Sequence, residues 1–372
     1  MKITRIETIP IKVPIKPEFA MRTGRGGSHL VSPFLLVKIY TDAGIVGLGE
    51  VSCTPRWSGE DQVSAAHFIK TYLAPLLEGE NPTEIERLTA KLRLGVAGNF
   101  FTKSGIEMAL WDILGKSLNK PVYQLLGGAV REFIPTKWSV SGLEPEKAAD
   151  IGRWAVAQGF KAMKVKVGID PDKDVARVAA VRQAIGPNIK LGVDANGGWS
   201  KEIAVKAIER LYDSAIYFAE QPIPPEDLMW LPKIREQIKI PLIADESIYS
   251  LQDAMTLAHL QAADVFSIYV GKAGGIGPAR KIAEFAESTG LKCTVGSNLE
   301  LGVGSAAMIH LATATRGIDA ETYPCDIIGP MFYEDDMLME PLPLIAGSAK
   351  PNERPGLGVE LNEKTVEKYR VH

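Results

Sequence analysis

The chain has 372 residues, of which 46% are hydrophobic, and a net charge of −3. This length and composition suit a protein with a sizeable buried core and about two domains. Because the chain has no basic surplus, no apolar run of bilayer length and no signal-peptide core, we expect a cytoplasmic enzyme without nucleic-acid or membrane partners.

Residues 1–128 are predicted to form an α+β domain. Up to about residue 55, apolar and polar side chains alternate between glycine turns, which is typical of an antiparallel meander. Residues 60–126 have helical periodicity and end at Gly127-Gly128.

From residue 129 onward, predicted strands and helices alternate, which indicates a parallel α/β barrel. Its eight strands are expected near residues 135–140, 161–167, 189–194, 216–220, 241–244, 265–269, 291–296 and 316–321. The predicted fold is an α/β protein with a modified (β/α)8 TIM-type barrel over residues 129–345 and an N-terminal capping domain. The Pro- and Gly-rich segment 346–372 is expected to return to the cap.

Three acidic residues follow successive apolar strand runs of the predicted barrel. Asp194, Glu220 and Asp245 are separated by 26 (220−194) and 25 (245−220) residues. This spacing predicts three carboxylates at the carboxyl ends of neighbouring parallel strands, where barrel active sites form. Oxygen ligands without His or Cys favour Mg²⁺, and Mn²⁺ accepts the same ligands.

Lys164 and Lys166 lie one strand earlier and point to the same side of that strand. Two ammonium groups beside a divalent ion lower the pKa of at least one lysine, as a lysine general base requires. The alternative is a solvated sheet face, but a parallel barrel strand has no such face except at its mouth.

Five motifs, in this order, resemble those of the enolase superfamily, muconate lactonizing enzyme subgroup. They are Lys164-x-Lys166, Val193-Asp194-Ala195-Asn196, Glu220-Gln221-Pro222, Ala244-Asp245-Glu246-Ser247 and Lys272-Ala273-Gly274-Gly275. The resemblance extends over almost the whole chain, and it implies homo-oligomers and a small carboxylate substrate.

The resemblance also implies roles for the motif residues. Lys166 is then the base that removes the proton α to the carboxylate, Lys164 contacts that carboxylate, and the three acids bind Mg²⁺. Asn196 and Glu246 are candidates for orienting the metal ligands, although Asn196 is equally expected as a turn residue.

The sixth strand departs from the family pattern. Racemases and epimerases of the subgroup carry a lysine three residues before Lys272, where this chain has Tyr269. A phenol with a pKa of about 10 is a poor base but a serviceable acid at neutral pH. One base and one acid favour β-elimination, in which Tyr269 protonates a departing hydroxyl. Alternatively, Tyr269 packs in the barrel and Lys272 is the second base.

Substrate contacts are predicted from the strand ends and from two capping loops, residues 21–27 and 54–59. Acids on the eighth strand would attract a cationic amine and repel a dianion such as muconate, and aromatic rings would contact a small ring or an ammonium group. Core packing is the alternative for each aromatic, and the loop residue His29 is expected to be solvated. The candidates are Trp57, Trp138, Ser297, Asp319 and Glu321.

Together these features predict Mg²⁺-dependent α-proton abstraction from an amino-acid carboxylate, followed by loss of water. The description resembles a cis-3-hydroxy-L-proline dehydratase. The alternatives are an epimerase of an amino-acid derivative, such as hydroxyproline betaine or a dipeptide, and a muconate-type cycloisomerase.

Overall fold

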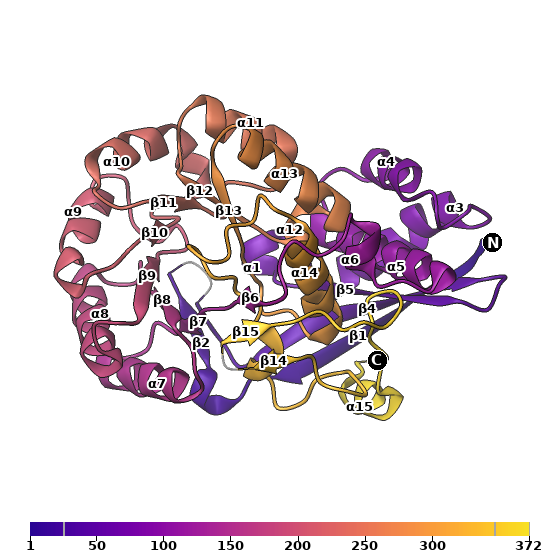
Figure 1. Ribbon diagram of the computed structural model, residues 1–372, viewed down its shortest axis with the longest axis horizontal. Coiled ribbons are helices and arrows are strands. Elements are labelled where there is room, and N and C mark those ends of the chain that lie inside the picture. The colour runs from indigo at the N-terminus through magenta and orange to yellow at the C-terminus, as the bar shows by residue number, and fades with distance from the viewer. Residues whose placement is uncertain (25–26, 346, 372) are drawn as a thin grey trace.

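The computed structural model describes residues 1–24, 27–345 and 347–371. A curled parallel sheet ringed by helices forms one side of the molecule, and an antiparallel sheet with its own helices forms the other (Figure 1). This is the predicted α/β architecture with an N-terminal cap.

The cap is built on an antiparallel sheet with the strand order β1-β4-β5. These strands are β1 (Ile3–Pro14), β4 (Val31–Thr41) and β5 (Val46–Ser52), and a hairpin of β2 (Met21–Thr23) and β3 (Gly27–His29) lies between β1 and β4 in the sequence. Its helices are α1 (Pro55–Ser58), α2 (Gln62–Phe68), α3 (Ala74–Leu77), α4 (Ile85–Gly95), α5 (Phe100–Leu118) and α6 (Val122–Leu125). The predicted order of a meander followed by helices is confirmed.

The barrel sheet has seven parallel strands in the order β13-β12-β11-β10-β9-β8-β7. They are β7 (Trp138–Val140), β8 (Ala162–Lys166), β9 (Lys190–Asp194), β10 (Ala219–Glu220), β11 (Leu242–Ala244), β12 (Val265–Ile268) and β13 (Lys292–Val295). The main helices that follow them are α7 (Pro145–Ala157), α8 (Pro171–Ile185), α9 (Ala204–Glu209), α10 (Leu231–Gln237), α11 (Leu251–His259), α13 (Ile276–Ser288) and α14 (Gly302–Ala314). Because these strands are parallel, their carboxyl ends meet at one mouth.

The predicted eighth strand is wrong as a regular strand. Ile318 makes one parallel bridge to Cys293 of β13, and Cys325 makes one parallel bridge to Thr136. Between these bridges the chain turns away from the sheet, with the backbone N–H of Tyr323 donating to the carbonyl of Asp319 at 2.9 Å. An irregular segment, residues 318–325, therefore closes the barrel.

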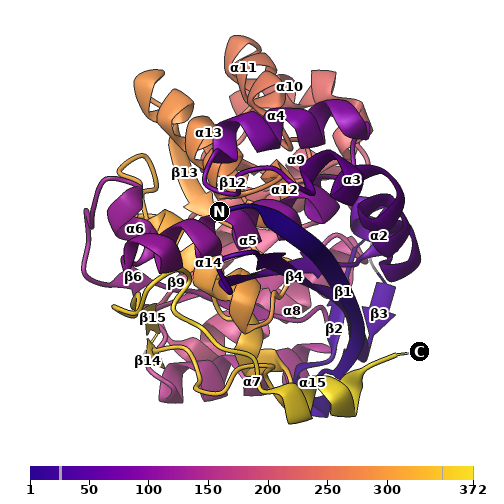
Figure 2. The ribbon, with the colours of Figure 1, turned by 90° about the vertical axis from the view of Figure 1, so that its right-hand side faces the viewer.

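The last part of the chain contacts both regions. The strand pair β14 (Leu344–Ile345) and β15 (Ser348–Ala349) extends from β6 (Ile134–Pro135). Further on, Gly356 bridges Pro121, and Arg370 bridges Ile11 of β1. Figure 2 shows α15 (Glu363–Tyr369) beside β1. The domain limits at residues 128 and 345 stay predictions.

Two buried acids of the cap bind the amino ends of barrel helices. Glu50 of β5 accepts hydrogen bonds from the backbone N–H groups of Leu301 and Gly304 at the start of α14, at 2.8 and 2.9 Å. Glu107 of α5 accepts from the first two residues of α13, at 2.7 and 2.8 Å. Since these N–H groups have no partner within their own helix, the carboxylates fix the cap on the barrel.

In the described part of the chain, none of the helices combines the length and apolarity needed to cross a membrane.

The packing of α5 on β5 yields a stability prediction. A Cβ atom added to Gly49 would overlap the carbonyl oxygen of Gly105, and neither backbone can move without separating strand and helix. We expect Gly49→Ala to destabilise the protein by about 1–3 kcal/mol, measured by urea unfolding. In the control Gly95→Ala, the new methyl group meets only side-chain atoms of Leu76 and Leu73, which can shift. Equal stability of the two variants would contradict this packing account.

Candidate active site

Three carboxylates meet at the barrel mouth, as predicted. Asp194 ends β9, Glu220 ends β10, and Asp245 directly follows β11. All three are buried, and one oxygen from each lies within 4.8 Å of the others. Burial raises the pKa of Glu220 to about 8, and the charges of Asp194 and Asp245 add to this effect.

These residues fit a hard divalent cation. Among the described residues, Oε2 of Glu220 is buried without a hydrogen-bond partner, although a buried carboxylate oxygen normally has one. A cation at the triad would supply that partner and offset the repulsion between the three charges. The donor set is all oxygen, which suits Mg²⁺.

Two lysines of β8 face the triad. The Nζ atom of Lys166 lies 2.7 Å from Oδ2 of Asp194, and Nζ of Lys164 lies 2.8 Å from Oε1 of Glu220. The side chain of Lys166 is 12% exposed and that of Lys164 only 3%, so Lys166 is nearer the open space.

Charged neighbours determine how Lys164 and Asp194 titrate. Burial would lower the pKa of Lys164, but the charges of Asp326, Glu220 and Asp194 outweigh burial and raise it. Burial would likewise raise the pKa of Asp194, and Lys166 and Lys164 instead lower it. The predicted lowering of a lysine pKa is therefore not found at Lys164.

Asp326 is a site residue that the sequence interpretation missed. It follows the irregular closing segment, and its Oδ2 atom accepts from Nζ of Lys164 at 3.0 Å and lies 3.2 Å from Nζ of Lys137. Its backbone N–H donates to the carbonyl of Val295, the last residue of β13. The available signal was an acid directly after the apolar pair Pro324-Cys325.

The prediction that Asp319 and Glu321 face the mouth is wrong. The carboxylate of Asp319 pairs with Lys292 at 3.4 Å, and the carbonyl of Glu321 accepts from Nζ of Lys190 at 2.7 Å. Lys292 and Lys190 are the first residues of their strands, so both acids lie at the opposite end of the barrel. The chain turns before it reaches the mouth, and the predicted repulsion of a dianionic substrate by these acids therefore has no basis.

The prediction that Trp138 contacts substrate is also wrong. Its indole is fully buried and stacks on Phe332, with ring centroids 4.4 Å apart and planes 5° apart. Phe19 and Trp154 pack on its other sides. Because neighbouring strand residues point to opposite faces, Ser139 faces the cavity instead.

The sixth strand places Tyr269 in the cavity and Lys272 outside its lining. The Tyr269 hydroxyl donates to Oδ2 of Asp245 at 2.6 Å, and burial, together with the charge of Asp245, raises the pKa of this phenol well above 10. Lys272 is 1% exposed, and its Nζ donates to the carbonyls of Asp245 and Ser267 at 2.6 and 2.9 Å and also to Oδ1 of Asp245. Lys272 is therefore bound to Asp245 and Ser267 and does not line the cavity.

Asn196 and Glu246, the two candidates for orienting the metal ligands, are hydrogen-bonded to each other. The side-chain amide of Asn196 donates to Oε1 of Glu246 at 2.9 Å, and the Asn196 backbone N–H donates to Oδ1 of Asp194. Asn196 also has a left-handed backbone, with φ of 47°, so the turn interpretation and the orienting interpretation are compatible.

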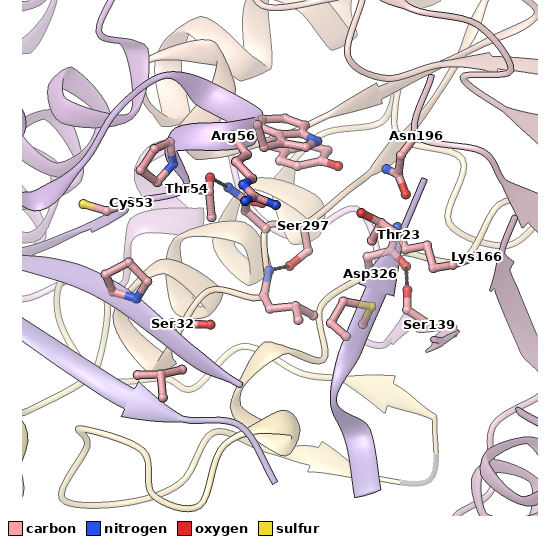
Figure 3. Close-up of a pocket in the computed structure, with 18 of the residues that line it drawn as sticks. Thr23, Ser32, Cys53, Thr54, Arg56, Ser139, Lys166, Asn196, Ser297 and Asp326 are labelled. Carbon is pink, nitrogen blue, oxygen red and sulfur yellow. Dashed lines mark hydrogen bonds between the residues drawn. The ribbon is translucent and has the colours of Figure 1, made fainter. Parts of the chain in front are cut away.

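The cap closes one side of a cavity of about 380 Å³ above these groups (Figure 3). Trp57 and Arg56 come from the loop after β5, and Ser297 follows β13. The Ser297 hydroxyl donates to Glu300 at 2.5 Å. Met21 and Thr23 also line the cavity. In that hairpin, Arg25, Gly26 and the side chain of His29 lie outside the described residues.

Family models match both parts of the chain. The model "Mandelate racemase / muconate lactonizing enzyme, N-terminal domain" matches residues 5–127, and "Enolase C-terminal domain-like" matches residues 146–365. The chain belongs to the enolase superfamily, muconate lactonizing enzyme subgroup.

Individual relatives resemble the chain over nearly its full length. It is 35% identical to the N-succinyl-L-Arg/Lys racemase of Bacillus cereus, over 100% of this chain and 98% of that protein. The crystal structure of that racemase aligns with a TM-score of 0.95 and 34% identity, over 100% of this chain and 99% of the other. Muconate cycloisomerase 1 of Rhodococcus opacus is 32% identical over 99% of this chain and 98% of its own. A dipeptide epimerase of Cytophaga hutchinsonii, complexed with Mg and D-Ala-L-Val, has a TM-score of 0.93 and 31% identity over 99% and 98% of the chains. The chain is therefore an enzyme of the enolase superfamily, and its similarity to a racemase and to an epimerase supports the abstraction chemistry of that superfamily.

The pKa of Glu220 predicts how Mg²⁺ binding depends on pH. Because this pKa is raised from 4.5 to about 8, Glu220 of the metal-free folded protein is protonated over most of the range below pH 8. The raised pKa stabilises the folded state fully below about pH 4.5, and this stabilisation is lost as pH rises through 8. Mg²⁺ must displace that proton, so we expect its affinity to rise between pH 6 and 8. Calorimetry in buffers of different ionisation enthalpy would measure the released proton. Wild-type affinity that does not change over this range would contradict the assignment.

Proposed function

We propose that Lys166 is the single base of a Mg²⁺-dependent α-proton abstraction from a small amino-acid carboxylate, and that the intermediate then loses a β-hydroxyl as water. The observation that supports this is Tyr269 in the position of the family's second lysine, with its hydroxyl donating to Asp245. A phenol whose pKa is raised further above 10 does not accept protons at neutral pH. One base can start an elimination, whereas epimerisation in both directions requires a base on each face.

In this proposal Asp194, Glu220 and Asp245 hold the ion, which, when bound, supplies positive charge that stabilises the enediolate. Lys164 donates to the substrate carboxylate. Lys166 takes the α-proton. In cis-3-hydroxy-L-proline the hydroxyl and the α-proton lie on opposite faces of the ring, so the acid that protonates the departing hydroxyl must stand opposite Lys166, which is the role predicted for Tyr269. Because the Tyr269 hydroxyl donates to Asp245 in this structure, it must turn from Asp245 to the hydroxyl of the substrate to act as that acid.

The proposed first substrate is cis-3-hydroxy-L-proline, and loss of water would give a cyclic enamine that tautomerises to the imine. We expect proton NMR to show this imine in the presence of Mg²⁺. Lys166→Met should reduce the rate by about 10²–10⁴-fold, because it removes the base while keeping the length of the side chain. Recovery of unchanged substrate would refute this substrate, and a fully active Lys166→Met would refute the base assignment.

A second candidate function is epimerisation of an N-substituted amino acid or a dipeptide. The names of two relatives, an N-succinyl amino-acid racemase and a dipeptide epimerase, favour it. The cavity of about 380 Å³ has space for roughly a dozen water molecules, which is more space than an unsubstituted hydroxyproline occupies.

Epimerisation makes a different prediction for the same site. Chiral chromatography of N-succinyl amino acids and dipeptides incubated with enzyme and Mg²⁺ would detect inversion at the α-carbon without loss of any group. Because the pathway then needs a proton donor opposite Lys166, Tyr269→Phe should reduce inversion by about 10²-fold or more. Inversion that is unchanged in Tyr269→Phe would exclude Tyr269 from that role.

A further inference from the structure

Trp57 connects the cap to the metal-binding side chains of the barrel. It lies on α1, a single helical turn in the loop after β5, and it lines the cavity. Its indole N–H donates to Oε1 of Glu246 at 3.1 Å. The same oxygen accepts from the side-chain amide of Asn196. One oxygen atom therefore receives a donor from the cap and a donor from the barrel.

The indole ring makes a second contact with the site. It stacks on Tyr269, with centroids 5.4 Å apart and planes 14° apart, and the edge of Phe101 packs against it. Tyr269 donates to Asp245, and Asn196 donates through its backbone to Asp194. Trp57 thus contacts both chains of hydrogen bonds that lead to the carboxylate triad, without touching a triad residue in any hydrogen bond of the described structure.

We propose that Trp57 is a positioning residue that couples closure of the loop at residues 54–59 to binding of the divalent ion. The inference rests on the proposed metal role of the triad. When the loop is closed, Trp57 restricts Glu246 and Tyr269, and through them Asn196 and Asp245. An ion that requires one orientation of the carboxylates therefore binds more tightly to the closed form, and by linkage the ion favours closure by the same factor.

The test compares two indoles that make the same type of hydrogen bond. Trp57→Phe keeps a ring against Tyr269 but removes the N–H donor. Trp111→Phe is the matched control, because the Trp111 indole donates to Oε1 of the buried Glu107 at 2.9 Å at the contact between cap and barrel. We expect Trp57→Phe to weaken Mg²⁺ binding by about tenfold in calorimetry, the low end for groups that orient metal ligands, and Trp111→Phe to leave it unchanged.

Hydrogen exchange gives a readout that does not depend on turnover. In the wild type, Mg²⁺ should slow amide exchange over residues 54–59, and this protection should be lost in Trp57→Phe. In a Glu246→Ala background, adding Trp57→Phe should weaken Mg²⁺ binding by less than it does in the wild type, because the acceptor is already gone. This comparison still tests the coupling if Trp57→Phe or Glu246→Ala alone lowers the stability of the protein, because it measures only the difference between the two backgrounds.

Equal Mg²⁺ affinity in the wild type, Trp57→Phe and Trp111→Phe, with unchanged protection of the loop, would overturn the coupling while leaving the metal site intact. A wild type that binds no Mg²⁺ would instead refute the proposed function on which the coupling rests.

Discussion

The constraint on which this structure depends is the burial of three carboxylates within a few ångströms of one another. Such a cluster is unfavourable unless positive charge and hydrogen-bond donors surround it. Lys164 and Lys166 supply the charge from β8, and Lys272 supplies it through its ion pair with Asp245. The barrel makes this possible because parallel strands bring their carboxyl ends to one mouth.

The same constraint explains why Lys272 and Tyr269 differ from what their sequence positions suggest. Lys272 could have been a second base, but the carbonyls of Ser267 and Asp245 hold it in the barrel wall. Tyr269 donates to Oδ2 of Asp245, so it stabilises a proposed metal ligand while presenting a ring to the cavity. Because Tyr269 stands where racemases and epimerases of the subgroup have a lysine, the site has one base, Lys166, at its open end.

Much of the fold and of the charged centre could be predicted from sequence. The apolar runs ending in Asp194, Glu220 and Asp245 predicted neighbouring strand ends, because side-chain pattern and parallel pairing fix both position and direction. Other residues could not be predicted, because their placement depends on irregular backbone. Asp319 and Glu321 lie in a turn that leaves the sheet before the mouth, so Asp326 takes the place expected for them. Trp138 was assigned to the wrong face of β7, because all three residues of this short strand are buried and both of its faces are covered by other parts of the protein.

The central claim is that Lys166 alone exchanges the α-proton. The most direct measurement follows deuterium uptake from D₂O into both enantiomers of each compound in a panel of N-acyl amino acids, dipeptides and hydroxyprolines, with Mg²⁺ present. The account predicts that only one enantiomer of an accepted compound exchanges, with its configuration retained, and that Lys166→Met abolishes this exchange. Exchange of both enantiomers at similar rates would contradict it, because a proton can be removed from each face only if a second base lies opposite Lys166.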